Sequence, residues 1–339
     1  APLDDGGSTV TQYTVTSDPD ELTVTARGFD AGLKTITDFG AGDDKGYAMA
    51  TLDDGKILVG GYVYNGTDDD FALARYDSDG TLDTTFGSSG RTTTDFGYGL
   101  DHIRALTVLD SGGILAGGYS DNGTDYDFAL ARYSSDGNLD TTFGSGGKTT
   151  TDFGYGSDAA YALTVLDSGE ILVAGYAYNG STFDFALARY DSDGTLDTTF
   201  GSSGRMITDF GYGTDLILAM TVLDSGKILV GGYADNGTDY DFALARYDAD
   251  GTLNSTFGSG GKTTTDFGYG SDGAYALTVL DSGGILVAGY AHNGSDYDFA
   301  LARYNGDGGL DPGLTSVVTG LTNGTAYTFT VTATNSIGT

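Results

Sequence analysis

The chain has no cysteine, which excludes disulfide bonds and thiolate metal sites. Tryptophan is also absent, so the usual aromatic platform for sugars is missing. No apolar run approaches the roughly 18 residues of a membrane span, so we expect no membrane insertion. Proline is scarce, whereas the 57 glycines suit many tight turns better than disorder.

Positive charge is scarce as well. Fifteen Lys and Arg face 48 Asp and Glu, giving a formal net charge of −33, and Glu occurs only at Glu21 and Glu170. Such a field repels nucleic acid and anionic membranes and attracts cations. Solvation of a salt-exposed surface is the simpler explanation, and specific cation binding is the alternative. The composition predicts an extracellular or cell-surface protein of bacterial or archaeal origin.

What the chain does contain is a 57-residue repeat, present five times without insertion or deletion. F-A-L-A-R-Y begins at Phe71, Phe128, Phe185, Phe242 and Phe299. T-D-F-G begins at Thr37, Thr94, Thr151, Thr208 and Thr265. A fixed period of this length indicates one supersecondary unit copied in space.

Each repeat carries four short runs typical of β-strands. In the third copy they span 149–153, 160–166, 171–178 and 185–190, bounded by Gly, Asp or Asn. Both faces of the central runs are apolar, with small residues between large ones, as expected of a sheet covered on both sides. The pattern predicts an all-β, five-bladed β-propeller with four-stranded blades. We expect the N-terminal run 33–39 to supply the outer strand of the fifth blade and close the ring.

The repeat resembles a known family. The segments G-K-I-L-V-G-G at 55–61 and F-A-L-A-R-Y-D-S-D-G-T-L-D-T-T-F-G at 71–87, together with T-D-F-G, are similar to the delta-60 repeat. That resemblance covers residues 33–312 and implies a β-propeller within large bacterial surface proteins. It implies no particular activity.

The two ends resemble halves of one fibronectin type III domain, residues 1–28 and 313–339, with the propeller at 33–312 inserted between them. Leu321 and Tyr327 stand where that family has its corner leucine and tyrosine. Three of the seven strands have no candidate. Either the sequence is part of a longer chain with neighbouring domains, or a second subunit donates the missing strands and the protein self-associates.

The turn after the fourth run of each repeat is rich in carboxylates around a Gly, as at the start of a calcium loop. Calcium is the one cofactor that this pattern suggests, and Asp bonding to its own backbone is the simpler explanation. The predicted calcium ligands are Asp77, Asp79, Asp83, Asp136, Asp140, Asp191, Asp193, Asp197, Asp248, Asp250, Asp307 and Asp311.

A second set of acids recurs just before the innermost run, where the propeller would have one mouth of its channel. We expect either backbone capping or a cation there. This set contains Asp44, Asp101, Asp158, Asp215 and Asp272.

The repeats differ chemically in the three residues that follow each of these acids. The predicted ligand lining is Tyr47, His102, Arg104, Tyr161 and Tyr275. Drift at a solvated rim is the alternative. The recurrent Tyr62, Tyr119, Tyr176, Tyr233 and Tyr290 are expected to face solvent.

Two further sets recur once per repeat. N-G-[ST] tripeptides fit the glycosylation pattern, although a tight hairpin also favours Asn-Gly, and they begin at Asn65, Asn122, Asn179, Asn236 and Asn293. We expect the arginine of F-A-L-A-R-Y to be a buried partner of a repeated Asp, with the Asp of T-D-F-G as candidate.

These observations favour a non-catalytic structural or adhesive surface protein, assembled into filaments by strand donation. A multivalent carbohydrate-binding propeller is the alternative, with glycans as partners. An enzyme resembling five-bladed glycosidases ranks third, because no unique pair of carboxylates stands out. His102 and His292 occupy non-equivalent repeat positions, which disfavours a two-histidine metal site.

Overall fold

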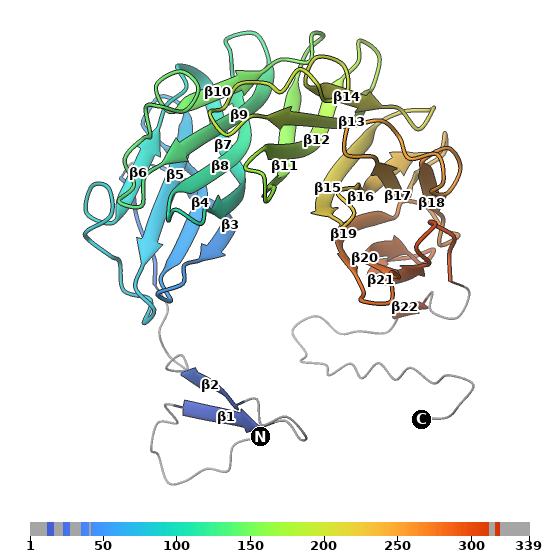
Figure 1. Cartoon of the computed structure of the whole chain (residues 1–339), viewed down its shortest axis with the longest axis horizontal. Helices are drawn as coiled ribbons and strands as arrows, with labels where there is room; N and C mark the ends of the chain where they lie inside the picture. The colour runs from blue at the N-terminus through green and yellow to red at the C-terminus, as the bar shows by residue number, and fades with distance from the viewer. Residues whose placement is uncertain (1–11, 17–22, 28–34, 41, 312–315, 319–339) are drawn as a thin grey trace. The chain divides into compact units, whose positions relative to one another are not determined.

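The computed structural model describes residues 12–16, 23–27, 35–40, 42–311 and 316–318. These residues form five four-stranded antiparallel sheets and one two-stranded sheet (Figure 1). This arrangement confirms the all-β class and is consistent with a five-bladed β-propeller. Among the described residues, no helix is long and apolar enough to cross a membrane.

Each four-stranded sheet uses one 57-residue period, and its strands pair in sequence order. The first strands are β3 (Asp44–Thr51), β7 (Tyr98–Val108), β11 (Asp158–Val165), β15 (Asp215–Val222) and β19 (Gly273–Val279). The second strands are β4 (Ile57–Tyr64), β8 (Ile114–Asp121), β12 (Ile171–Tyr178), β16 (Ile228–Asp235) and β20 (Ile285–His292). The third strands are β5 (Asp69–Tyr76), β9 (Tyr126–Tyr133), β13 (Phe183–Tyr190), β17 (Tyr240–Tyr247) and β21 (Tyr297–Tyr304). The fourth strands are β6 (Arg91–Thr94), β10 (Lys148–Thr151), β14 (Arg205–Thr208), β18 (Lys262–Thr265) and β22 (Ser316–Val318).

The chain divides into two compact units, Ala1–Thr208 and Asp209–Thr339. In the first unit, β7 packs on β3, β4 and β5, and β11 packs on β7, β8 and β9. In the second unit, β19 packs on β15, β16 and β17. Successive sheets within a unit therefore lie face to face, and their two-sided apolar pattern follows from that cover.

A hydrogen bond between a tyrosine and a threonine joins neighbouring sheets. The buried Tyr133 hydroxyl in the second sheet donates to Thr94 Oγ1 of the first, at 2.8 Å. Tyr304 makes the same bond to Thr265 in the second unit, and burial raises the pKa of Tyr304 to about 12. A buried phenol needs such a partner, so the hydroxyl is satisfied where two sheets meet.

The expectation that the N-terminal run pairs with the fifth sheet is wrong for this structure. The edge of β21 is paired with β22, through Phe299–Val318, Ala300–Val317 and Leu301–Ser316. Loop closure gives a physical reason. β22 follows β21 after a short connection, whereas the N-terminal run lies more than 200 residues away, and longer loops cost more entropy to close.

The N-terminal run lies against the first sheet instead. Thr37 Oγ1 accepts a hydrogen bond from the Tyr76 hydroxyl at 2.7 Å, and Thr35 donates to the Gly80 carbonyl at 2.8 Å. The Tyr76–Thr37 bond repeats the Tyr133–Thr94 bond between successive sheets. The run therefore occupies the position next to the first sheet that an outer strand of a preceding sheet would take.

The predicted fibronectin-like domain is mostly outside the described residues. β1 (Gln12–Thr16) and β2 (Thr23–Arg27) form an antiparallel pair where two of its strands are expected. Leu321 and Tyr327 lie outside the described residues, and no inserted fibronectin type III domain is shown.

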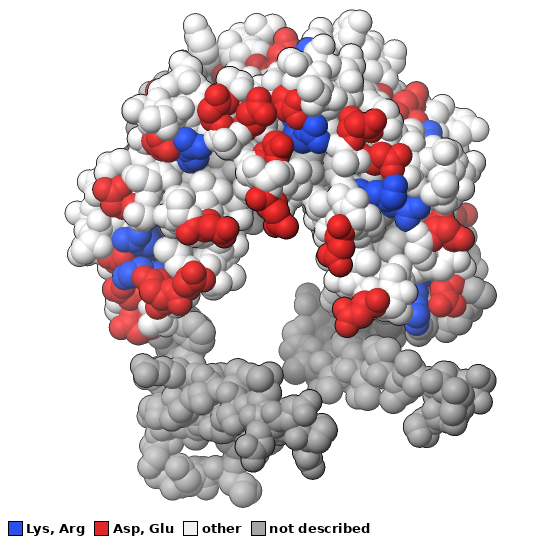
Figure 2. All heavy atoms as spheres, viewed as in Figure 1, with Lys and Arg blue, Asp and Glu red and all other residues white. Residues whose placement is uncertain are grey.

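Acidic side chains are spread over the face drawn in Figure 2, with fewer basic ones among them.

The β21–β22 pairing is tested by cysteine cross-linking, because the native chain has no cysteine to interfere. We expect the Ala300→Cys/Val317→Cys variant to form a disulfide on mild oxidation, since paired residues in antiparallel strands have a suitable Cα separation. Mass spectrometry of the peptides after proteolysis provides the readout. If the Ile36→Cys/Ala300→Cys variant cross-links instead, β21 pairs with the N-terminal run, as the repeat pattern predicts, and the β21–β22 pairing is contradicted.

Candidate functional site

The first strand of each four-stranded sheet contains a β-bulge. The register with the second strand shifts between Gly46 and Ala48 in the first sheet, and between Ile103 and Ala105 in the second. A bulge adds one unpaired residue and redirects its side chain. The extra residues are Tyr47, Arg104, Tyr161, Leu218 and Tyr275. The bulged position is therefore one at which the repeats differ in chemistry, with Arg104 and Leu218 in place of the tyrosine of the other three repeats.

A glycine on the second strand makes room for the bulge. A Cβ at Gly61 would lie 1.7 Å from the Lys45 carbonyl oxygen, and one at Gly118 would lie 1.9 Å from that of His102. No side chain fits at such a distance, so only glycine allows the first strand to approach so closely. The glycine before each second-strand tyrosine is thus required by the bulge.

Six residues of the first unit form what we call the aromatic–arginine cluster: Tyr47, Tyr62, His102, Arg104, Tyr119 and Tyr161. The guanidinium carbon of Arg104 lies 4.0 Å from the centroid of the Tyr47 ring, 5.6 Å from that of Tyr119 and 5.5 Å from that of Tyr161. These distances are in the range of cation–π attraction. Three rings from three successive sheets therefore surround one positive charge.

His102 connects the aromatic rings to a carboxylate. Its ring stacks on Tyr62 at 4.1 Å between centroids, its Nδ1 lies 2.6 Å from the Tyr119 hydroxyl, and its Nε2 lies 2.9 Å from Asp69 Oδ2. The carboxylate assigns the proton of neutral His102 to Nε2, so Nδ1 accepts from Tyr119. Burial lowers the pKa of His102, and the positive charges of Arg104 and Lys45 act in the same direction.

The structure brings together four of the five predicted lining residues: Tyr47, His102, Arg104 and Tyr161. Tyr275 lies in the second unit, where it is 56% exposed and 5.7 Å from Tyr290 between ring centroids.

The expectation that Tyr62, Tyr119, Tyr176, Tyr233 and Tyr290 face solvent is wrong. Tyr62 is buried and the other four are half-buried. The rings of Tyr62 and Tyr119 pack within the cluster. Asp69 was missed. The other repeats carry an aromatic residue at that position, namely Tyr126, Phe183, Tyr240 and Tyr297. The replacement of an aromatic residue by Asp69 in the first repeat is visible in the sequence and could have identified this position.

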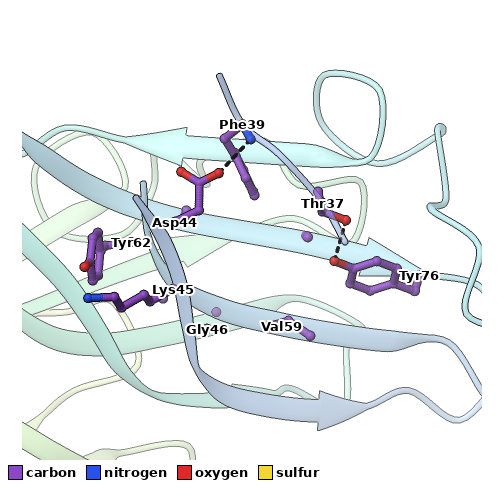
Figure 3. Close-up of a pocket in the computed structure, with 12 residues that line it drawn as sticks. Thr37, Phe39, Asp44, Lys45, Gly46, Val59, Tyr62 and Tyr76 are labelled. Carbon is purple, nitrogen blue, oxygen red and sulfur yellow. Dashed lines mark hydrogen bonds between the residues drawn. The ribbon is translucent and has the colours of Figure 1, made fainter. Parts of the chain in front are cut away.

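A pocket opens on the first sheet beside the cluster (Figure 3). Its lining includes Thr37 and Phe39 from the N-terminal run and Lys45 and Tyr62 from β3 and β4. The Phe39 backbone N–H donates to Asp44 Oδ2 at 2.8 Å, which fixes the run against β3. The ammonium nitrogen of Lys45 lies 5.6 Å from the centroid of the Tyr62 ring, so a second cation borders the cluster.

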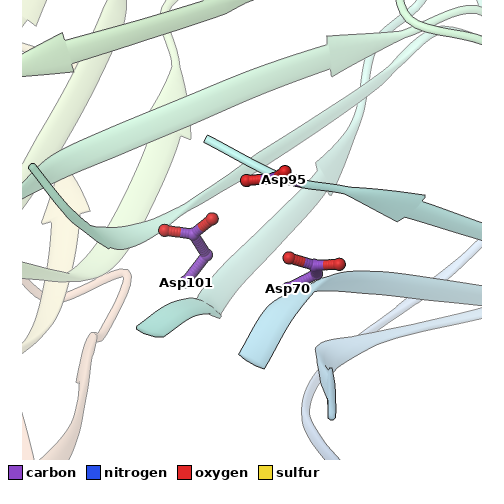
Figure 4. Close-up of side chains that lie close together, drawn as sticks. All are labelled: Asp70, Asp95 and Asp101. Carbon is purple, nitrogen blue, oxygen red and sulfur yellow. The ribbon is translucent and has the colours of Figure 1, made fainter. Parts of the chain in front are cut away.

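Three aspartates converge where the first and second sheets meet (Figure 4). Asp70 lies on β5, Asp95 follows β6, and Asp101 lies on β7, each offering one oxygen within 4.8 Å of the others. Burial and the neighbouring carboxylates Asp70 and Asp95 raise the pKa of Asp101 to about 8. Burial likewise raises the pKa of Asp70.

The aspartates predicted to line the channel mouth differ in burial. Asp101, Asp158 and Asp272 are fully buried and do not sit on a solvated rim, whereas Asp44 is half-buried. Asp158 caps backbone as expected, accepting from the Phe153 N–H at 2.7 Å and the Tyr178 N–H at 3.1 Å. Asp215 is also buried.

The predicted calcium turns are built around other contacts. Asp79 Oδ1 accepts from the backbone N–H of Thr81 at 2.9 Å and from its hydroxyl at 2.7 Å. Asp193 and Asp250 repeat this pattern with Thr195 and Thr252. Among the described residues, the turn acids form no group of three within ligand distance. These contacts account for the turns without a metal, and calcium there stays a prediction.

The arginine of F-A-L-A-R-Y pairs with a repeated aspartate, but the T-D-F-G aspartate is not its partner. Arg75 Nε lies 2.8 Å from Asp83 Oδ2, and its guanidinium carbon lies 4.7 Å from the centroid of the Phe86 ring. In the fourth repeat Asn254 replaces the aspartate, and its Oδ1 accepts from Arg246 Nη2 at 3.0 Å. The T-D-F-G aspartates are exposed, and those from Asp95 onward directly follow the fourth strand of a sheet.

The asparagines of N-G-[ST] have structural contacts of their own. Asn65 Nδ2 donates to Asp68 Oδ1 at 2.6 Å and to Asp70 Oδ2 at 3.0 Å. Asn122 and Asn236 repeat both bonds with their own aspartates. A glycan on Nδ2 would remove one of these donated hydrogens. Glycosylation stays a prediction.

Five segments match a family model described as a domain of unknown function (DUF5122) beta-propeller, at residues 52–86, 111–143, 167–200, 224–257 and 282–314. One match falls in each repeat, which supports the propeller fold. No curated protein matches this chain.

Several solved structures are similar to this chain at low identity. A Bacteroides caccae protein of unknown function is 11% identical, with 92% of each chain covered and a TM-score of 0.42. A Lactobacillus plantarum protein is 13% identical, with 91% of this chain and 76% of that chain covered and a TM-score of 0.49. An exo-1,5-α-L-arabinanase from a bovine ruminal metagenomic library is 16% identical, with 78% and 95% covered and a TM-score of 0.39.

The expectation that the protein is not an enzyme is corrected by these likenesses. Besides the arabinanase, they include an ulvan lyase, 15% identical with a TM-score of 0.42, and a puromycin hydrolase, 14% identical with a TM-score of 0.46. That expectation rested on the absence of a unique pair of carboxylates in the sequence. The lack of a conspicuous carboxylate pair in the sequence does not exclude catalysis.

The arginine–aspartate pair is tested by Asp83→Asn, a change that the fourth repeat carries naturally at Asn254. The Thr85 hydroxyl, Lys56 and Arg75 hold the pKa of Asp83 well below its usual range. Its ionised form therefore stabilises the fold above the unfolded pKa of about 4. We expect the free energy of unfolding to fall by about 1.5–3 kcal/mol at pH 7. Chemical denaturation measures it.

The stability gap between the native protein and Asp83→Asn should narrow as the pH falls below about 4, because Asp83 loses its advantage when protonated. Asp79→Asn is the matched control. It removes the same charge from an exposed turn and should have little effect. Equal losses in both variants would contradict a specific role for the Arg75–Asp83 pair.

Proposed function

We propose that this protein is an extracellular glycan-binding β-propeller whose aromatic–arginine cluster holds an acidic saccharide. The observation that carries the proposal is the environment of Arg104. Its Nε–H is buried without a hydrogen-bond partner, and within the described residues its guanidinium forms no ion pair. Unsatisfied buried donors are rare in folded proteins and call for an explanation.

The ligand chemistry follows from the neighbours of Arg104. The aromatic rings of Tyr47 and Tyr161 offer apolar faces on which the C–H face of a sugar can pack, and the Tyr119 hydroxyl offers a polar contact. The planar guanidinium suits a carboxylate or sulfate group, which it can bind through two N–H donors. A sugar with an acidic substituent uses both parts of the site.

The net charge of −33 does not oppose such a ligand at close range. Exposed charges are screened beyond roughly 8–10 Å at moderate ionic strength. Within that distance, Arg104 and Lys45 supply positive charge beside the rings. The surrounding acidity would instead reduce non-specific attachment of polyanions such as nucleic acids.

The proposal is tested by titrating the full chain with an oligogalacturonate and, separately, with a neutral galactose oligosaccharide. We expect the acidic probe to bind and the variant Arg104→Met, which removes the charge at similar length, to weaken binding about 10- to 100-fold, as for losing one charge-assisted hydrogen bond of roughly 1.5–3 kcal/mol. Isothermal titration calorimetry measures both. Chromatography of the probe afterwards detects any turnover.

Leu218→Ala is the control, because Leu218 occupies the same bulge in the fourth sheet. It should leave binding unchanged. Equal affinity for acidic and neutral probes, or an unchanged affinity in Arg104→Met, would overturn the assignment of an acidic saccharide to this cluster.

A surface-assembly function is the second candidate, and the two-stranded β1–β2 sheet favours it. Among the described residues these strands pair only with each other, and two strands alone are marginally stable in water, so further strands would complete the sheet. They would come from a longer chain or from a neighbouring copy, as the resemblance to a divided fibronectin type III domain implies. Adhesion or filament formation at the cell surface would follow from strand donation.

Assembly is measured by negative-stain electron microscopy of the full chain and by light scattering after gel filtration. Strand donation predicts fibres, and deletion of residues 1–28 should abolish them while the propeller stays folded by circular dichroism. Monodisperse single copies at high concentration would contradict assembly without affecting the glycan proposal.

A further inference from the structure

Aspartate clusters recur at the junctions between successive sheets. Asp70, Asp95 and Asp101 form the first, between the first and second sheets. The second unites Asp127, Asp152 and Asp158, and a third, in the second unit, unites Asp241, Asp266 and Asp272. In each cluster one oxygen from every carboxylate lies within 4.8 Å of the others. The first and last members are buried, and the middle one is exposed.

Each of these clusters contains a buried carboxylate oxygen without a hydrogen-bond donor. In the first cluster this is Asp70 Oδ1, whose residue is only 7% exposed. Asp127 Oδ1 and Asp241 Oδ1 repeat the feature in the other two clusters. A buried carboxylate oxygen without a donor costs free energy, and a cation bound at these positions would offset that cost.

The second oxygen of each carboxylate in the first cluster is held by a donor. Asn65 Nδ2 donates to Asp70 Oδ2 at 3.0 Å, the Phe96 N–H donates to Asp101 Oδ2 at 2.7 Å, and the Gly97 N–H donates to Asp95 Oδ1. The three groups are therefore oriented before any ligand arrives, and Figure 4 shows them around a common space. Such orientation lowers the entropic cost of binding.

We propose that each of these clusters binds a calcium ion, which ties two successive sheets together. All the donors are carboxylate oxygens, which suit a hard cation better than zinc or copper. Calcium lies 2.3–2.6 Å from its ligands, so two ligand oxygens on opposite sides are up to about 5 Å apart, in keeping with the clusters. Magnesium requires shorter distances and a stricter geometry.

The origin of the three ligands gives the ion a structural role. In the first cluster, Asp70 and Asp95 belong to the first sheet and Asp101 to the second. An ion bound to all three would convert mutual repulsion between carboxylates into a cross-link. The N-G-[ST] hairpin participates as well, because its asparagine orients the first aspartate. This inference is independent of the proposed glycan function.

The experiment uses the full chain, freed of metal with a chelator and titrated with calcium chloride. Calorimetry gives the number of sites, and thermal unfolding followed by circular dichroism gives the stability. We expect dissociation constants of roughly 10⁻⁴–10⁻³ M, as in extracellular calcium modules, and a rise of several degrees in the unfolding temperature at 10 mM calcium. Magnesium at the same concentration should raise it less.

Asp101→Asn should lower the number of sites by one, and Asp101→Asn/Asp158→Asn by two. Without metal, Asp101→Asn should unfold at a higher temperature than the native protein, because it relieves repulsion. With calcium the order should reverse. This reversal distinguishes loss of a ligand from a general folding defect.

Asp79→Asn is the matched control, since it removes one charge from a predicted calcium turn outside the clusters. It should leave the number of sites unchanged. An unchanged unfolding temperature on adding calcium would overturn the proposal. So would a loss of sites in Asp79→Asn with none in Asp101→Asn, which would assign calcium to the turns instead.

Discussion

Packing between successive sheets is the constraint on which the rest of this structure depends. The contacts recur at constant separations along the chain: 39 residues for Tyr133–Thr94, 60 for Arg132 to the Ser192 carbonyl, and 53 for Lys148 to the Asp95 carbonyl. A single insertion between partners would move one of them out of register. The absence of insertions and deletions in the repeat is thus explained by geometry.

The same regularity isolates the positions where the repeats differ. A bulge is present in every first strand and a glycine opposite allows it, so the scaffold presents one redirected side chain per sheet. Arg104 uses that position in the second sheet, and His102 and Asp69 complete the network. Function in this molecule is better sought in such substitutions than in the repeated motifs.

Charge is distributed in two different ways. Turn acids such as Asp83 are ionised because Thr85, Lys56 and Arg75 stabilise the negative form. The junction acids, in contrast, lie close to one another with two of the three buried, and burial raises the pKa of Asp158 to about 7. A fall in pH therefore protonates the buried junction acids before the turn acids, although the sequence presents both as aspartates near glycine.

The sequence by itself determined the all-β class, the four-strand repeat and the identity of four cluster residues, because periodicity and local asymmetry are local properties. Tertiary structure alone decided the rest. Tyr62 is buried by stacking on His102, a residue forty positions away, and Arg75 pairs with the turn acid and not with the T-D-F-G acid. The pairing of β22 with β21 likewise depends on which strand reaches that edge at the lower entropic cost. These outcomes depend on contacts between segments distant in sequence, and no local pattern records them.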